Sequence, residues 1–236
     1  MVHNAVEVRS ISDEGRRELR HRLRMRLGVP KESSIVATAG RLSPEKGTAY
    51  FLEAIPRVAK SFPKVLFVIF GDGPLKAQLE ERSEKLGLAM PVCFPGFVPD
   101  FAELLPGVDL MVNPSLSEVM PNVVLEAMAA GVPVVATEVG NVAEIAGPDE
   151  AVALVPSGDP PAIARVVSDL LRDPDRAREL GGAGQRRVRE AFSPASQKAQ
   201  FRALYQEMVP GLALDMGGPE QLAATTRAPQ TAPQST

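Results

Sequence analysis

The chain has 236 residues, of which 44% are hydrophobic and 23% are charged, and its formal net charge is −3. These values are typical of a globular protein with one large or two small domains, and the charge excludes a global basic field that would attract nucleic acid. One cysteine excludes an intrachain disulfide, and without a long apolar run or a signal peptide we expect a cytoplasmic or membrane-peripheral protein.

The first segments predict an extended lead-in at residues 1–12 and a helix at 13–28. Leucines recur at every fourth position of this helix, and seven arginines lie within residues 9–26. The leucine stripe favours docking of the helix on the rest of the domain. The arginines leave a weak peripheral contact with anionic lipid as the alternative.

From residue 34 onward, short apolar runs alternate with segments of helical spacing. The apolar runs predict buried strands at 34–40, 64–71, 91–98, 109–115, 132–140 and 151–156. The helical patterns lie at 47–62, 74–87, 100–107, 122–131, 142–147, 160–171, 174–191 and 195–209. Buried strands that are each followed by a helix predict a parallel sheet covered on both faces.

The expected fold class is therefore α/β, with a doubly wound, six-stranded, mainly parallel sheet over residues 13–209. Residues 210–236 are rich in Gly, Pro, Ala, Thr and Gln without apolar periodicity, and we expect them to be disordered. Ligands bind to such sheets at the carboxyl ends of the strands, so the loops there hold the candidate site residues. The two histidines stand far apart and no cluster of metal ligands is visible, so we expect neither a metal nor another cofactor.

Two glutamates, Glu118 and Glu126, stand eight positions apart around the helix predicted at 122–131. Glu126 lies among apolar and small residues, where a buried carboxylate needs a compensating partner. It either has a basic partner or a solvent-facing position, or it accepts hydrogen bonds from ligand hydroxyl groups. Glu118 is either a solvated loop residue or a group that binds sugar hydroxyls or a positive centre.

The start of the same helix predicts an anion site. Pro121 is favoured at the first helical position, where its missing N–H costs nothing. The amides of Asn122, Val123 and Val124 would then be free donors, and together with the helix dipole they suit a phosphate.

Two further loops follow predicted strands. The segment AGRLSPEKG carries Arg41 and Lys46, which can converge on a diphosphate, although a charged loop is often only solvated. The segment FGDGP carries Gly71 and Gly73, but Lys76 stands where a dinucleotide fingerprint has its third glycine. This segment is weak evidence for NAD and favours a tight turn that lets the backbone approach a ligand.

Five motifs occur in series: GRLSPEKG, GDGP, GFVPD, PSLSEVMPNVVLEAMAAGVPVVAT, and a VG followed by Glu144. The series resembles the C-terminal, nucleotide-sugar-binding domain of retaining glycosyltransferases of family 4, the glycosyl transferases group 1 proteins, which have the GT-B fold. The resemblance covers residues 2–209. Two positions depart from the family pattern, because Val119 and Asn141 stand where glycine is usual.

The resemblance implies a role for each candidate residue. Glu118 would contact the donor sugar as the catalytic residue, and Glu126 would bind the ribose hydroxyls. The diphosphate would be held by two side chains and two backbone amides, and the base by backbone near the third motif. The implied donor-binding residues are Arg41, Lys46, Asn122, Val123, Glu126, Gly71, Gly73 and Val98.

The resemblance also implies a sugar transfer from a UDP- or GDP-sugar with retention of configuration and without a metal. The opening segment VHNAVEV resembles the interdomain hinge of the family, so we expect the N-terminal acceptor domain to be missing and the isolated chain to be inactive alone. The alternative is a non-catalytic nucleotide-sugar-binding module, or a subunit of a split glycosyltransferase. An epimerase or an NAD-dependent enzyme is disfavoured by the paired glutamates and the incomplete glycine motif.

Overall fold

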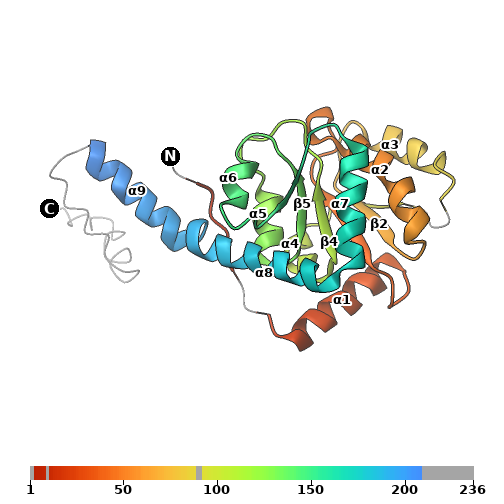
Figure 1. Ribbon diagram of the computed structural model, residues 1–236, viewed down its shortest axis with the longest axis horizontal. Coiled ribbons are helices and arrows are strands. Elements are labelled where there is room, and N and C mark those ends of the chain that lie inside the picture. Colours follow the sequence, from red (N-terminus) through yellow and green to blue (C-terminus); the bar gives the residue numbers. More distant parts are fainter. Residues whose placement is uncertain (1–2, 9–10, 89–91, 209–236) are drawn as a thin grey trace, which may run out of the picture.

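The computed structural model describes residues 3–8, 11–88 and 92–208, so the tail predicted to be disordered lies outside the described residues. Helices pack on both faces of one parallel sheet, and the predicted α/β class is confirmed (Figure 1). The strands are β1 (Ile35–Ala39), β2 (Leu66–Phe70), β3 (Cys93–Gly96), β4 (Leu110–Asn113), β5 (Val134–Thr137) and β6 (Ala153–Val155). The helices are α1 (Asp13–Leu27), α2 (Thr48–Ser61), α3 (Lys76–Glu84), α4 (Phe101–Leu104), α5 (Asn122–Ala129), α6 (Val142–Ala146), α7 (Pro160–Arg172), α8 (Pro174–Ala191) and α9 (Pro194–Met208), with 3-10 turns η1 (Pro44–Lys46) and η2 (Leu105–Gly107).

The strand order is β3-β2-β1-β4-β5-β6, and every neighbouring pair is parallel. The chain starts in the middle of the sheet, builds outward to β3, returns, and builds outward to β6. The direction of winding therefore switches between β1 and β4. Loops leaving the carboxyl ends of β1 and β4 diverge at this point, which is where doubly wound sheets form a ligand crevice.

Alternating strand residues feed two separate hydrophobic cores. In β1, Val36 belongs to the core under α2, α3 and α7, while Ile35 and Ala37 belong to the core under α1, α5 and α8. In β2, Phe67 belongs to the core under α2, α3 and α7, and Val68 belongs to the core under α1, α5 and α8. Because both faces of β1, β2, β4 and β5 are buried, these strands read as continuous apolar runs in the sequence, whereas the edge strands β3 and β6 are only partly buried.

Helix α1 docks on the domain, as its leucine stripe predicts. It begins after Ser12, whose hydroxyl accepts a hydrogen bond from the amide of Gly15 at 3.1 Å, and it ends at Gly28 in the left-handed conformation. Leu23 is completely buried in the core. Several of the arginines also find protein partners, so the helix is anchored by both kinds of side chain.

Arg24 shows how one of these arginines is used. Its side chain is 3% exposed, and its guanidinium donates to the carbonyl of Ser33 at 2.6 Å and to the carboxylate of Asp109 at 2.6 Å. The same carboxylate accepts a hydrogen bond from the amide of Ile35 at 2.8 Å. The pair thus ties α1 to the starts of β1 and β4. No described helix is long and apolar enough to cross a membrane.

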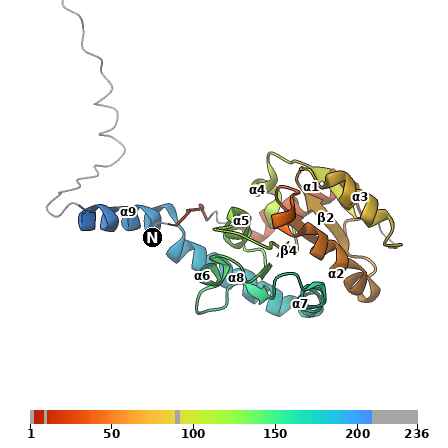
Figure 2. The same cartoon turned by 90° about the horizontal axis from the view of Figure 1, so that it is seen from above.

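Helix α9 extends away from the sheet, and residues 3–8 of the lead-in run beside its first turns (Figures 1 and 2). The amide of His3 donates to the side chain of Gln200 at 2.9 Å, and the side chain of Gln197 donates to the carbonyl of His3 at 2.6 Å. Residues 194 positions apart in sequence are therefore neighbours. The lead-in next passes the start of α5, at the edge of the sheet that carries the predicted site.

Candidate functional site

The loops that follow β1 and β4 meet at the switch point of the sheet. The ammonium group of Lys46 lies 2.6 Å from Oε1 of Glu118, and the amide of Leu116 donates to the carbonyl of Glu45 at 2.8 Å. Gly47 has a φ of 61°, and a β carbon there would overlap the carbonyl oxygen of Pro114. Glycine is therefore required for the two loops to approach this closely.

The loop after β2 supports the loop after β1. A β carbon on Gly71 would overlap the carbonyl oxygen of Gly40, and one on Gly73 would lie 2.6 Å from the amide nitrogen of Leu42. The amide of Leu42 also donates to the carbonyl of Asp72 at 2.9 Å. The glycines thus allow a close backbone approach to the neighbouring loop, whereas the predicted approach was to a ligand. A role of Gly71 and Gly73 in donor binding stays a prediction.

Glu118 is held on several sides. Its side chain is 8% exposed, and Oε1 accepts a hydrogen bond from the hydroxyl of Ser115 at 2.8 Å in addition to the ion pair with Lys46. A β carbon on Gly140 would overlap its carbonyl oxygen, so the loop after β5 presses against its backbone. By contrast, the side chain of Val119 is 82% exposed. Glu118 is thus a fixed, nearly buried carboxylate rather than a solvated one.

At the start of α5, Pro121 does not take the first helical position that was predicted for it. Pro121 is the N-cap, so the helix begins at Asn122, and the amide of Val124 donates to the carbonyl of Pro121 at 3.1 Å. The expectation that Val124 offers a free donor is therefore wrong, because the cap residue closes the first turn. The amides of Asn122 and Val123 have no backbone acceptor among the described residues.

The lead-in contacts this helix start. The side-chain amide of Asn4 donates to Oδ1 of Asn122 at 2.8 Å. The amide nitrogen of Asn4 lies 3.2 Å from the sulfur of Met120. The side-chain oxygen of Asn122 is therefore engaged with the lead-in, while its backbone amide points out of the first turn of α5 without a backbone acceptor among the described residues.

Glu126 lies half-buried one turn further along α5. It lines a hollow of about 710 Å³ together with Val6, Pro99 and Asp100, and within the described ranges it forms no ion pair. Burial raises the pKa of its carboxyl group above the usual value. The interpretation that gives Glu126 a basic partner is wrong for the described residues, while a partly solvent-facing position and a role in binding ligand hydroxyls both stay open. A carboxylate without a partner at the rim of a hollow can accept hydrogen bonds from hydroxyl groups.

Arg41 and Val98 complete the predicted set. Arg41 is exposed at the rim of the switch point, and no ion pair holds it within the part of the chain that the structure describes. Val98 is 6% exposed, and its carbonyl accepts a hydrogen bond from the amide of Phe101 at 3.1 Å. Phe97, directly before it, is 72% exposed. All these residues lie at the carboxyl edge of the sheet.

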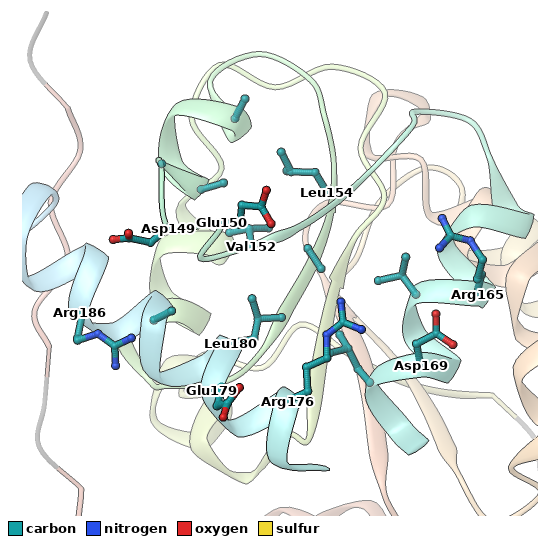
Figure 3. Close-up of a pocket in the computed structure, with 17 residues that line it drawn as sticks. Asp149, Glu150, Val152, Leu154, Arg165, Asp169, Arg176, Glu179, Leu180 and Arg186 are labelled. Carbon is teal, nitrogen blue, oxygen red and sulfur yellow. The ribbon is translucent and has the colours of Figure 1, made fainter. Parts of the chain in front are cut away.

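A second hollow, of about 800 Å³, lies away from these loops, between β6, α7 and α8 (Figure 3). Figure 3 shows charged side chains of both signs around it, among them Arg165, Arg176, Glu150 and Glu179. It contains none of the predicted site residues. The neighbouring edge strand, β6, has only three residues, and such short edge strands offer little backbone for pairing with another chain.

Neither the geometry nor the residue types point to a metal site in the described part of the chain. No group of three or more His, Cys, Asp or Glu side chains there could hold a metal ion. The edge of the sheet offers instead two cations, two amides and two carboxylates in different surroundings. Cations and amides bind phosphate oxygens, and fixed carboxylates bind hydroxyl groups.

The fold is that of a Rossmann-like domain, and the carboxyl edge of its sheet carries groups of the types that suit phosphate and hydroxyl oxygens. The family model described as "Glycosyl transferases group 1" matches residues 20–187, and the chain belongs to this family. It is 34% identical over 161 residues to 2-deoxystreptamine N-acetyl-D-glucosaminyltransferase of Streptomyces fradiae, covering 66% of this chain and 38% of that protein.

A second relative is the GDP-mannose-dependent alpha-(1-6)-phosphatidylinositol monomannoside mannosyltransferase of Mycolicibacterium smegmatis. It is 34% identical over 179 residues, covering 71% of this chain and 46% of that protein. The chain thus spans less than half the length of these two curated relatives.

Solved structures share the fold. Anabaena Alr3699/HepE in complex with UDP-glucose superposes with a TM-score of 0.77 at 24% identity, covering 87% of this chain and 57% of that one. The C-terminal domain of the glycosyl transferase group 1 family protein LpcC from Francisella tularensis superposes with a TM-score of 0.68 at 26% identity. In that case 78% of this chain and 96% of that chain are covered.

Three contacts of the site could not be foreseen from the motifs. Ser115 donates to Glu118, Asn4 donates to Asn122, and Gly140 abuts the backbone of Glu118. Ser115 carries a local signal, since it is a polar residue at the carboxyl end of the strand predicted at 109–115, and such residues lie at the ligand edge. Asn4 carries none, because its position depends on how the lead-in folds back onto the domain.

Proposed function

We propose that this chain is the donor-binding, C-terminal domain of a retaining glycosyltransferase of family 4. It would transfer a sugar from a UDP- or GDP-sugar to an acceptor. The observation that carries the proposal is the meeting of Lys46 and Glu118, at 2.6 Å, across the switch point of the sheet. A cation suited to the diphosphate and a fixed carboxylate suited to the sugar thus stand side by side.

The remaining groups fit the same ligand in order along its length. The backbone amides of Asn122 and Val123, with the positive end of the helix dipole, suit the phosphate that departs with the nucleotide. Arg41 suits the same diphosphate as a second cation. Glu126, without a basic partner among the described residues, suits the two ribose hydroxyls, and the backbone near Val98 suits the base.

The proposed chemistry needs no metal. Negative charge develops on the departing diphosphate, and the cations and amides at the sheet edge are positioned to stabilise it. For retention of configuration, the acceptor attacks the face from which the diphosphate leaves, with the leaving phosphate taking the acceptor proton. Glu118 then orients the sugar and stabilises its developing positive charge, and it need not form a covalent bond.

The proposed partner is an acceptor-binding domain. Helix α9 presents Phe201, Leu204, Tyr205 and Met208, which are between 38% and 68% exposed and recur with the spacing of one helix face. Together with the lead-in, which runs beside α9, this stripe would pack against the second half of the enzyme. The chain covers less than half the length of the two curated relatives described above, and an acceptor-binding partner would supply the other part.

Thermal unfolding with UDP-glucose, GDP-mannose or NAD tests the proposal. A ligand at about one hundred times its Kd stabilises the folded chain by about 2.7 kcal/mol, which raises the Tm of a domain of this size by about 5–10 °C. We expect one nucleotide sugar to raise the Tm by this amount and NAD to leave it unchanged. A shift with NAD alone would favour the dinucleotide-binding alternative.

A further inference from the structure

Ser115 is a buried polar residue two positions after the end of β4, and both its carbonyl oxygen and its hydroxyl group are hydrogen-bonded. It is 1% exposed, and its carbonyl oxygen accepts a hydrogen bond from the hydroxyl of Thr137 at 2.5 Å. Its own hydroxyl lies 2.8 Å from Oε1 of Glu118. The contact of Gly47 with Pro114 fixes the backbone on the other side. Ser115 is therefore held in a single position relative to β4 and β5.

The hydroxyl of Ser115 can donate only one proton, and it has two oxygen neighbours. Besides Glu118, it lies 3.3 Å from Oδ1 of Asn113, and the side-chain nitrogen of Asn113 is buried without a partner. The proton goes to the carboxylate, because a hydrogen bond to a charged oxygen is the stronger one. An Asn113 amide turned over about its Cβ–Cγ bond then donates to Ser115. The result is a directed chain from Asn113 through Ser115 to Glu118.

Lys46 has two competing partners in the proposed reaction. In this structure its ammonium group is paired with Oε1 of Glu118, and its side chain is 31% exposed. A bound diphosphate would attract the same ammonium group. Glu118, whose side chain is 8% exposed, would then lose its cationic partner at the moment when its orientation matters.

We infer that Ser115 is a positioning residue that keeps Glu118 aimed at the donor sugar when Lys46 turns to the diphosphate. The inference rests on the proposed function. Both Ser115 and Lys46 bind Oε1, so Oε2 is left for the sugar, to which no described residue forms a hydrogen bond. Asn113 does not contact Glu118 in this chain of hydrogen bonds. It donates to the hydroxyl of Ser115 and so directs the proton of that hydroxyl toward Glu118.

Calorimetric titrations with matched ligands test this role. UDP and UDP-glucose, and GDP and GDP-mannose, are titrated into the wild-type chain, Ser115→Ala and Ser117→Ala. Ser117 is the control, because it lies in the same loop but is exposed. We expect Ser115→Ala to weaken binding of the nucleotide sugar about tenfold and that of the free nucleotide less than twofold, as loss of a hydrogen bond to a charged group implies. Ser117→Ala should change neither.

A purely structural role for Ser115 predicts a different pattern. In that case Ser115→Ala would weaken the binding of the nucleotide and of the nucleotide sugar by the same factor, and this result would overturn the inference. Unchanged affinity for both ligands would overturn it as well. Ser115→Thr keeps the hydroxyl group and should bind the nucleotide sugar as tightly, relative to the free nucleotide, as the wild-type chain does. If Ser115→Ala does not fold, Ser115→Cys keeps the volume with a weak donor and should show the same selective loss. Failure of the wild-type chain to bind any of the four ligands would overturn the proposed function itself.

Discussion

Gly140 approaches Glu118 so closely that a β carbon at position 140 would overlap the carbonyl oxygen of Glu118. The contact joins the loop after β5 to the loop after β4. Gly140 also has a φ of 53°, a conformation that favours glycine. The backbone of the candidate catalytic residue is therefore held in place by a glycine 22 positions away, which has no side chain that could take part in the reaction.

Gly140→Ala should damage both stability and ligand binding. Gly87→Ala is the matched control, because Gly87 has a similar φ of 61° but no atom within 4 Å of a β carbon. The control should lose about 1–2 kcal/mol from the left-handed conformation alone. Gly140→Ala should lose about 3 kcal/mol or more, because its backbone must also move. Urea unfolding of the two variants measures the difference, and equal losses would show that the contact with Glu118 is unimportant.

Asp109 should be among the most sensitive charged positions. Its carboxylate serves the buried Arg24, the partly exposed Arg20 and the amide of Ile35. Asp109→Ala leaves a guanidinium buried without its partner, so we expect a loss of about 3–5 kcal/mol in the free energy of unfolding. The control is Asp175→Ala, which removes a fully exposed ion pair with Arg178 and should cost less than about 1 kcal/mol. Similar losses in both variants would contradict the anchoring role of Arg24.

The partly buried carboxylate of Glu126 should lower the stability of the folded chain and strengthen ligand binding. Burial raises its pKa in the folded chain above the usual value of 4.5, so the folded state holds the proton more tightly than the unfolded state. Its contribution to stability is present below that value and is lost as the pH rises through the folded pKa. Glu126→Gln should therefore melt at a higher temperature than wild type at neutral pH, with the difference shrinking toward acid pH.

The same substitution should weaken nucleotide binding, because an amide is a poorer acceptor for ribose hydroxyls than a carboxylate. We expect a loss of about tenfold in affinity, of the size of one hydrogen bond to a charged group. Glu103→Gln, an exposed position at the same hollow, should alter neither melting nor binding. Lower stability of Glu126→Gln at neutral pH would show that Glu126 has a stabilising partner.

The apolar stripe on α9 should contribute little to the stability of this chain. Phe201→Asp with Tyr205→Asp changes two stacked rings that are 42% and 50% exposed. We expect the free energy of unfolding to change by less than about 0.5 kcal/mol. Phe192→Ala, at a position that is 1% exposed, should instead cost about 3–5 kcal/mol. A large loss on changing the stripe would mean that it packs within this chain and is not a docking surface.

The fold follows from the sequence because its strands are buried on both faces. Runs such as 65–70 are apolar throughout, and each is followed by helical spacing, which leaves few alternatives to a parallel sheet. The sequence also places Lys46 and Glu118 in loops that follow strands, but the ion pair between them was not predicted. It depends on β1 and β4 being neighbours in the sheet, which the order of elements along the chain does not reveal.

Other details depend on contacts that the sequence pattern does not contain. The role of Pro121 as N-cap rather than first helical residue depends on the conformation of the turn that precedes α5. The bond from Asn4 to Asn122 depends on the lead-in folding back along α9. The orientation of Ser115 toward Glu118 depends on packing among three loops.

The central claim is that the cations at the switch point hold the diphosphate of a nucleotide. Calorimetric titration of UDP, GDP and ADP into the wild-type chain and into Arg41→Ala, Lys46→Ala tests it most directly. The control removes two charges elsewhere, with Lys31→Ala and Arg57→Ala, which are both exposed. We expect saturable binding of one nucleotide, unchanged in the control and weakened at least about a hundredfold in the test variant. Equal affinity in the test and control variants would contradict the assignment of the site.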